Sequence, residues 1–423
     1  MNPALEIARR CADRTTLDQA VKSAAQQSQY AEYQQWQPIS LAQGHTGIAL
    51  LCAEMDQQRP DEGWDRAGHE HLQTALAGAA PHDVSLISGL AGAGLAAIRL
   101  SGGRERYRRL LAQIDSTLTA PVRATVHRLQ AGPGTAAHDL DLVSGLTGLA
   151  AYLLTRAQTE PNCPDARASL DLALGTLARL LADRSDPRAW HTPAQRSAGP
   201  LLESYPNGHH NCGLAHGVPG PLAILSLAWT AGIQVPRARE ALQAAASWLV
   251  AHHSGTPEAP DWPDAVPLGS STATQRCGPG RAAWCYGAPG VARSLYLASV
   301  ACDETLWRET ALRTIRAVAN RPVADWQLIT PGFCHGTAGL AQILARFAAD
   351  TANPQITAAA RVAREELTLG FEADSVLGVR AVEPGQVRVD HPGLLDGAPG
   401  VALALLGVPA TADPAWDRAF LLA

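Results

Sequence analysis

The chain has 423 residues, of which 46% are hydrophobic and 17% charged, and its formal net charge is −5 at pH 7. This mild acidity argues against nucleic acid or an anionic membrane as the main partner. Aromatic residues make up only 5% of the chain, while alanine, leucine and glycine abound. Such a composition favours helices that pack closely through small side chains over a β-rich fold.

The N-terminal sequence MNPALEIARRCADRTTL lacks an apolar core, so we expect no secretory signal. No uninterrupted apolar run approaches the roughly 18–20 residues of a membrane span, so we expect no integral membrane protein. Eight cysteines without a secretory signal indicate free thiols in a reducing compartment. Together these features predict a cytoplasmic protein, and docking on a membrane-associated complex stays open.

Seven Gly-x-x-Gly motifs recur along the chain and indicate a repeat architecture. They begin at Gly44, Gly89, Gly145, Gly217, Gly287, Gly336 and Gly397. Each leads into an apolar run, for example 95–100, 149–154, 221–229, 291–298, 340–347 and 401–407. Amphipathic stretches such as 166–184 and 235–253 lie between these runs, with apolar residues at helical spacing. Each repeat is therefore predicted to hold one buried, glycine-led helix and one half-exposed helix.

Repeats of this kind bury their apolar faces only against neighbouring repeats, and seven of them can close on themselves. We therefore predict an all-α fold, an (α/α) toroid of seven helical hairpins with inner and outer rings, as a single domain over residues 1–423. An open α-solenoid is the alternative. Two Pro/Gly/Ser-rich stretches, 183–211 and 254–280, are predicted loops at the rim of a site.

The residue just before the first glycine is polar in every repeat: Gln43, Ser88, Ser144, His216, Tyr286, His335 and Asp396. One residue earlier, cysteine occurs only in the fifth and sixth repeats, as Cys285 and Cys334. Because equivalent positions in a closed ring face the same place, Cys285, Cys334 and His335 are predicted to converge. Two thiolates and an imidazole form a tetrahedral zinc set with one open position, as in catalytic zinc sites. Taken singly, each cysteine also fits a small buried hydrophobe and the histidine a hydrogen-bonded side chain.

His216 lies in the same column, and Asp141 stands four residues before the glycine of the third repeat, where the sister sequence HDVSLISGLAG has Ser85. This pattern predicts a proton-transfer histidine with an orienting carboxylate. Alternatively, His216 caps a helix or joins the metal with His209 and His210. We expect those two to be solvated or at the rim, because they lie in loop-like sequence.

Three residues around the first cysteine ligand complete the candidate site. Arg281, four residues before Cys285, is a candidate to stabilise developing negative charge, with a surface arginine as the alternative. Trp284 and Tyr286 adjoin Cys285 and are candidates for contact with a substrate. The remaining cysteines are interpreted as structural: Cys11, Cys52, Cys163, Cys212, Cys277 and Cys302.

The motifs GLAHGVPG, WCYGAPG and GFCHGTAG, in this order, resemble the lanthionine synthetase C-like proteins, the cyclases of lanthipeptide biosynthesis. DLVSGLTG and LLDGAPG fit the same pattern, so the resemblance covers essentially the whole chain. It implies an (α/α) toroid with one catalytic zinc ion held by Cys285, Cys334 and His335. It further implies His216 and Asp141 as the acid/base pair and Arg281 as the matching arginine. At this length the chain resembles the stand-alone class I enzymes.

The implied reaction is the intramolecular addition of precursor-peptide cysteine thiols to dehydroalanine and dehydrobutyrine, which forms lanthionine and methyllanthionine rings. The implied partners are a dehydrated precursor peptide, a separate dehydratase and a transporter. Two other functions stay open: addition of glutathione or another free thiol to dehydrated peptides, and a non-catalytic peptide-binding scaffold with a structural zinc. An unrelated toroid hydrolase or terpene-type cyclase is disfavoured, because no paired carboxylates or Asp-rich motif accompany the glycines.

Overall fold

The computed structural model describes residues 2–30, 35–80, 83–132, 134–183, 187–197, 199–269, 278–408 and 415–423. The chain divides into two compact units, unit 1 (Met1–Ile114 with Leu328–Trp416) and unit 2 (Asp115–Gln327 with Asp417–Ala423). His82, Cys277 and parts of both predicted loops lie outside the described residues. The single domain over residues 1–423 stays a prediction.

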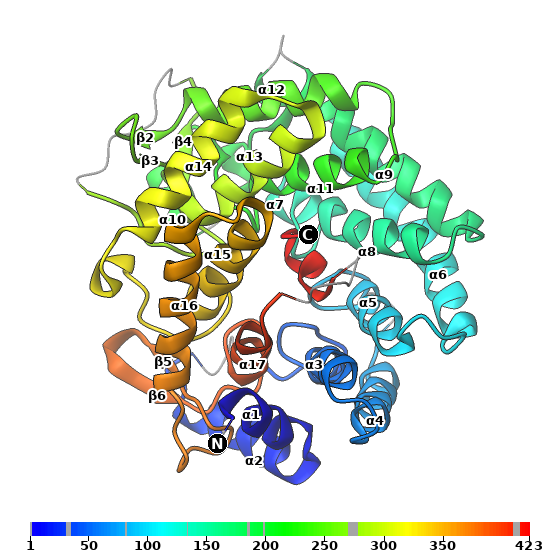
Figure 1. Ribbon diagram of the computed structural model, residues 1–423. Coiled ribbons are helices and arrows are strands. Elements are labelled where there is room, and N and C mark those ends of the chain that lie inside the picture. Colours follow the sequence, from blue (N-terminus) through cyan, green and yellow to red (C-terminus); the bar gives the residue numbers. More distant parts are fainter. Residues whose placement is uncertain are drawn as a thin grey trace. The chain divides into compact units, whose positions relative to one another are not determined.

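Each glycine motif leads into a helix, as predicted. These helices are α3 (His45–Gln58), α5 (Leu90–Ser101), α8 (Leu146–Thr159), α11 (Pro219–Thr230), α13 (Ala288–Cys302), α15 (Thr337–Thr351) and α17 (Ala398–Leu406) (Figure 1). They are buried on nearly every side; in α11, for example, residues 219–228 are all buried. None of the described helices combines the length and the apolarity needed to cross a membrane.

A second set of helices alternates with the first and buries only one face. Its members are α4 (Trp64–Ala77), α6 (Arg108–Gln130), α9 (Pro164–Ala182), α12 (Ala238–Ala251), α14 (Thr305–Ala319) and α16 (Pro354–Leu369). In α14 the buried residues include Trp307, Ala311, Ile315 and Val318, which follow the helical period. Five of the glycine-led helices pack against the amphipathic helix that follows them, in the pairs α3–α4, α8–α9, α11–α12, α13–α14 and α15–α16.

The seventh pair is built from the two ends of the chain. Among the described residues after α17, the only helical element is the short 3₁₀-helix η5 (Trp416–Phe420). Instead α1 (Pro3–Ala12) packs against α17 within unit 1, and α2 (Arg14–Gln27) follows α1 (Figure 1). In unit 1 the glycine-led helices pack in the order α15, α17, α3, α5, and in unit 2 in the order α8, α11, α13.

The two stretches predicted as loops contain short elements in addition to irregular chain. The first holds η1 (Pro187–Trp190), η2 (Ala194–Arg196), α10 (Gly199–Ser204) and β1 (His209–Asn211); the second holds β2 (Ser254–Gly255), β3 (Pro260–Asp261) and β4 (Ala265–Pro267). Strand β1 pairs with β4, and β2 pairs with β3, both antiparallel. Strands of two or three residues show no readable alternation, so sequence patterning missed them.

The remaining short elements flank repeats in other parts of the chain. Helix α7 (Ala137–Leu140) precedes the third repeat, and η3 (Val323–Trp326) precedes the sixth. Strands β5 (Ala381–Glu383) and β6 (Val387–Val389) form an antiparallel hairpin around η4 (Pro384–Gln386) before the seventh. Strand β6 lies against α2 in unit 1.

In several repeats, the second glycine of the motif allows close approach between neighbouring repeats. A Cβ atom on Gly290 would lie 2.3 Å from the Trp284 carbonyl oxygen and 3.1 Å from the Leu214 Cβ atom of the preceding repeat. On Gly400 it would lie 2.1 Å from the Leu394 oxygen and 3.2 Å from the Phe333 Cβ atom. Side chains other than hydrogen are therefore excluded at both positions by backbone atoms that cannot move independently.

Gly290→Ala is expected to lower the free energy of unfolding by about 1–3 kcal/mol, the usual cost of overpacking a filled core. Gly175→Ala in α9 is the matched control, because the nearest atom to its new Cβ would be the flexible Arg179 guanidinium at 3.6 Å. That control is expected to be neutral or to stabilise by up to about 1 kcal/mol through helix propensity. Urea unfolding of both variants measures the difference, and equal stabilities would contradict the close-approach explanation.

Candidate metal and proton-transfer site

Five of the turns that precede the glycine-led helices share one backbone hydrogen bond, which shows that these five turns are structurally equivalent. In each of five repeats, the carbonyl six residues before the first glycine accepts from the N–H just after that glycine. The pairs are His45–Pro38 (2.9 Å), Leu90–Asp83 (2.8 Å), Val218–Asn211 (3.0 Å), Thr337–Thr330 (3.1 Å) and Ala398–His391 (3.1 Å). In these five repeats, equivalent positions in the sequence are thus equivalent positions in the fold.

Backbone hydrogen bonds also join the turns of neighbouring repeats, and the accepting carbonyl lies two residues before the first glycine of its motif. In unit 2, Leu142 N–H donates to the Ala215 oxygen (3.0 Å) and Ala215 N–H to the Cys285 oxygen (3.5 Å). In unit 1, Cys334 N–H donates to the Leu395 oxygen (2.8 Å) and Leu395 N–H to the Ala42 oxygen (3.3 Å). Within each unit, the residues of the predicted column therefore lie on turns that are joined to one another by backbone hydrogen bonds.

Asp141 and His216 form a direct pair in unit 2, as the sequence predicted. The His216 Nδ1 atom lies 2.7 Å from Asp141 Oδ2. The other oxygen, Oδ1, accepts backbone N–H bonds from Ser144 (2.8 Å) and Gly145 (2.9 Å). Asp141 is 2% exposed, so its carboxylate is fixed by the turn on one side and orients the imidazole with the other.

The environment of His216 favours its protonated form. Burial lowers the pKa of the imidazole, but the hydrogen bond and negative charge of Asp141, with a contribution from the Cys285 sulfur, outweigh it and raise the pKa above the ordinary value. Because the carboxylate accepts from Nδ1–H, the neutral tautomer leaves the Nε2 lone pair open. This arrangement suits a group that takes up and returns a proton.

Tyr286 is held beside His216 by three contacts. Its ring stacks on the imidazole with centroids 6.1 Å apart and an interplanar angle of 29°. Its hydroxyl oxygen accepts from Asn211 Nδ2 at 2.8 Å, and a Cβ on Gly213 would lie 2.7 Å from the ring. Burial raises the pKa of the Tyr286 phenol to about 12, so the phenol keeps its hydrogen near neutral pH.

The residues around Cys285 have unequal exposure. Cys285 itself is 5% exposed. Trp284 is fully buried, its indole N–H donates to the Phe420 oxygen (3.0 Å), and its ring packs edge-on against the Phe420 ring. Arg281 is partly exposed. Trp284 thus packs in the core of unit 2 behind the cysteine turn, which disfavours the direct substrate contact suggested for it.

Cys334 and His335 lie in the equivalent turn of unit 1, before α15. Both are partly exposed, and Phe333, which precedes them, is fully buried against Trp416. The N–H groups of Phe333 and Cys334 both donate to the Leu395 oxygen. His335 Nδ1 lies 3.7 Å from Asp396 Oδ1, the column residue of the next repeat. The turn is therefore anchored by its backbone hydrogen bonds.

Two expectations about neighbouring histidines were wrong. His209 and His210 are 1% and 5% exposed, not solvated. His210 packs against Trp190 and Trp248 with centroids 4.9 and 5.1 Å apart, and His209 packs against Tyr205. Pairing of β1 with β4 explains their burial, since the strand carries both histidines into unit 2.

Sequence reasoning missed Asn211, the last residue of β1. It lies six residues before Gly217, a position that varies among the repeats: Pro38, Asp83, Asp139, Asn211, Arg281, Thr330 and His391. Its contact with Tyr286 depends on the placement of a short strand, so only the structure could reveal it. The five described cysteines outside the column are buried free thiols.

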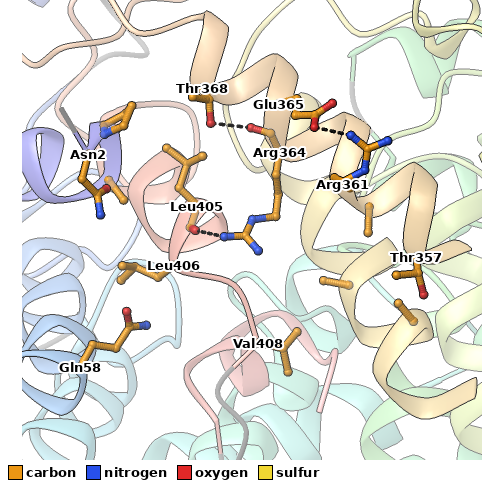
Figure 2. Close-up of a pocket in the computed structure, with 15 residues that line it drawn as sticks. Asn2, Gln58, Thr357, Arg361, Arg364, Glu365, Thr368, Leu405, Leu406 and Val408 are labelled. Carbon is orange, nitrogen blue, oxygen red and sulfur yellow. Dashed lines mark hydrogen bonds and ion pairs between the residues drawn. The ribbon is translucent and has the colours of Figure 1, made fainter. Parts of the chain in front are cut away.

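A pocket of about 620 Å³ lies elsewhere in unit 1, between α1, α16 and the end of α17. Figure 2 shows Arg364 reaching across it to the Leu405 carbonyl oxygen, at 2.5 Å, and Arg361 paired with Glu365. None of the predicted site residues lines this pocket. Its charged groups are already paired within the protein.

Comparisons with known proteins identify the family. The profile described as Lanthionine synthetase C-like protein matches residues 35–421. The nisin biosynthesis protein NisC of Lactococcus lactis subsp. lactis is 24% identical over 317 residues, which are 73% of this chain and 73% of that protein. A solved structure of a nisin cyclase matches with a TM-score of 0.76 at 20% identity, covering 97% of this chain and 98% of that chain. This likeness confirms the predicted all-α toroid fold, and the chain belongs to the lanthionine synthetase C-like family.

Proposed function

We propose that this protein is a zinc-dependent lanthipeptide cyclase that adds cysteine thiols of a dehydrated precursor peptide to dehydroalanine or dehydrobutyrine in the same peptide. One observation carries the proposal: the Asp141–His216 pair and Cys285 stand on three neighbouring turns joined by backbone hydrogen bonds. The hydrogen-bonded turns thereby carry both the proposed proton-transfer pair and a proposed thiolate ligand, Cys285. The names of the relatives NisC and nisin cyclase support the same reaction class.

The metal donors we propose are Cys285, Cys334 and His335, each of which offers one ligand atom. Two soft sulfurs and an imidazole nitrogen suit Zn²⁺ and leave one tetrahedral position open. Zinc bound there would lower the pKa of a substrate thiol and so supply a nucleophile near neutral pH. The set fits this ion by its donor chemistry, and Cys285 and Cys334 both stand two residues before the first glycine of their motifs.

His216 moves the proton of the reaction. Addition forms one S–C bond at the β-carbon and one C–H bond at the α-carbon, so the thiol proton is conserved and no oxidant is needed. His216 Nε2 accepts the thiol proton or returns it to the α-carbon, while Asp141 keeps Nδ1 protonated and fixes the ring. Arg281 is proposed to stabilise the negative charge that develops on the adjoining carbonyl oxygen, and Tyr286 to contact the substrate.

Mass spectrometry with thiol alkylation tests the function directly. The purified protein, supplied with zinc, is incubated with a dehydrated, cysteine-containing peptide, and free thiols are then alkylated. Ring formation leaves the peptide mass unchanged and removes the alkylation sites. In a parallel reaction that contains glutathione, addition of this thiol would instead increase the mass by one glutathione per dehydro residue that reacts. Thiols that remain fully alkylatable would contradict cyclisation and favour a binding scaffold. A cytoplasmic location, a separate dehydratase and a transporter remain predictions.

A further inference from the structure

We propose that Asn211 is a positioning residue that turns the phenol hydrogen of Tyr286 away from the protein and toward the bound peptide. This inference rests on the proposed function and extends it to a residue outside the predicted column. Asn211 Nδ2 donates to the Tyr286 oxygen at 2.8 Å. That oxygen is thus occupied as an acceptor, and its own hydrogen is free to be donated.

The orientation of the Asn211 amide is fixed by its second contact. Its Oδ1 atom accepts the backbone N–H of Gly213 at 2.9 Å. A backbone N–H can only donate, so Oδ1 must face Gly213 and the NH₂ group must face the phenol. The side chain is 5% exposed, so water has little access to compete for either bond.

The ring of Tyr286 is held by two further groups, Gly213 and His216. Gly213 lies against one part of the ring, because a Cβ there would approach within 2.7–2.8 Å of the Cε1 and Cδ1 atoms. The His216 imidazole stacks on the ring as well. Together with the Asn211 bond at the hydroxyl, these contacts define where the phenol oxygen stands and which side its hydrogen can take.

The two-stranded β1–β4 sheet positions Asn211. Asn211 pairs with Ala265 in the β1–β4 ladder, and the Asn211 carbonyl accepts from Val218 N–H at 3.0 Å. The two long segments between repeats therefore meet beside the proton-transfer pair. We infer that they contribute to the site by orienting Tyr286, in addition to bordering it.

A phenol held in this way stabilises negative charge that develops on the substrate. Addition of sulfur at the β-carbon places negative charge on the carbonyl oxygen of the dehydro residue. A preoriented neutral O–H stabilises such charge without reorganising during the reaction. Asn211 does not touch the reacting atoms; it acts through Tyr286.

A mutant cycle with an isosteric variant tests the assignment. Tyr286→Phe is expected to lower kcat about 100-fold, as loss of one preorganised donor does. Asn211→Asp keeps the bond to Gly213 N–H but can only accept, so it captures the phenol hydrogen and is expected to lower kcat about as much. Asn211→Ala leaves the phenol free to rotate and is expected to cost only about 10-fold. Zinc content and KM should change little in all three variants.

The decisive comparison is made in the Tyr286→Phe background, where Asn211→Asp and Asn211→Ala should have no further effect on kcat. Asn353→Ala is the matched control, since that asparagine caps α16 through its own Oδ1 atom and is outside the site. Additive losses in the double variants, or full kcat in Tyr286→Phe, would overturn the inference and leave the cyclase function intact. Failure of the wild-type protein to turn over would overturn both, because the donor role requires the reaction.

Discussion

Cys334→Ala and Cys285→Ala are each expected to lose bound zinc and cyclisation together. The proposed centre has only three protein donors. Even groups that merely hydrogen-bond to a metal ligand contribute about 10–100-fold to metal affinity. Removal of a direct donor is therefore expected to weaken zinc binding by at least about 100-fold. Zinc is measured by elemental analysis after gel filtration and by competition with a chromogenic chelator, and cyclisation by alkylation of residual thiols.

Cys302→Ala is the matched control for this experiment. Cys302 ends α13, the helix that follows the Cys285 turn, and is buried, as Cys285 is. The control loses a buried sulfur from the same repeat and is expected to keep full zinc and activity. Stoichiometric zinc in the Cys285→Ala/Cys334→Ala double variant would refute the ligand assignment.

The repeat and its column of polar residues could be predicted because both depend on positions where a local steric clash excludes any side chain. Gly290 and Gly400 cannot carry a Cβ, since each lies against a carbonyl of its own turn and a side chain of the neighbouring repeat. The Gly-x-x-Gly motif therefore recurs where two turns pack together. Its glycines align the repeats, so the residues before them can be compared position by position. That register correctly matched Asp141 with Ser85 and brought Asp141 to His216.

Features that depend on distant pairing could not be predicted in this way. No local pattern shows that α1 takes the place of a helix after α17, because the two lie at opposite ends of the sequence. The same holds for the burial of His210 and the contact of Asn211, which follow from pairing of β1 with β4. Trp284 looked like a substrate contact because of its place beside Cys285, yet its indole is bonded in the core.

The third repeat shows how a structural turn can gain an additional contact. In the first and second repeats, Ser40 and Ser85 accept the N–H three residues later through their hydroxyl oxygens, at 3.0 Å. Asp141 makes the same bond to Ser144 with Oδ1. A carboxylate has a second oxygen that a hydroxyl lacks, and in this repeat it reaches His216. The turn is thus retained while an orienting group is added.

Asp141→Ser therefore separates the turn from the chemistry. It restores the arrangement of the sister repeats, keeps the bond to Ser144 N–H, and removes only the oxygen that faces His216. We expect the fold and zinc content to persist, while kcat falls by about 10–100-fold because the imidazole loses its orientation. Asp139→Asn is the control: Asp139 is a buried carboxylate of α7 that pairs with Arg128 instead. It should affect stability and leave kcat unchanged.

His216→Ala is expected to retain zinc and to lose cyclisation by about 10²–10⁴-fold, the range that a positioned acid/base group contributes. If Asp141 acts only through this imidazole, Asp141→Ser should have no further effect in the His216→Ala background. Loss of zinc in His216→Ala would instead identify the residue as a metal ligand, and wild-type kcat would exclude it from proton transfer. The pair of substitutions thus tests whether the Asp141 carboxylate works through His216, as the 2.7 Å contact between Nδ1 and Oδ2 indicates.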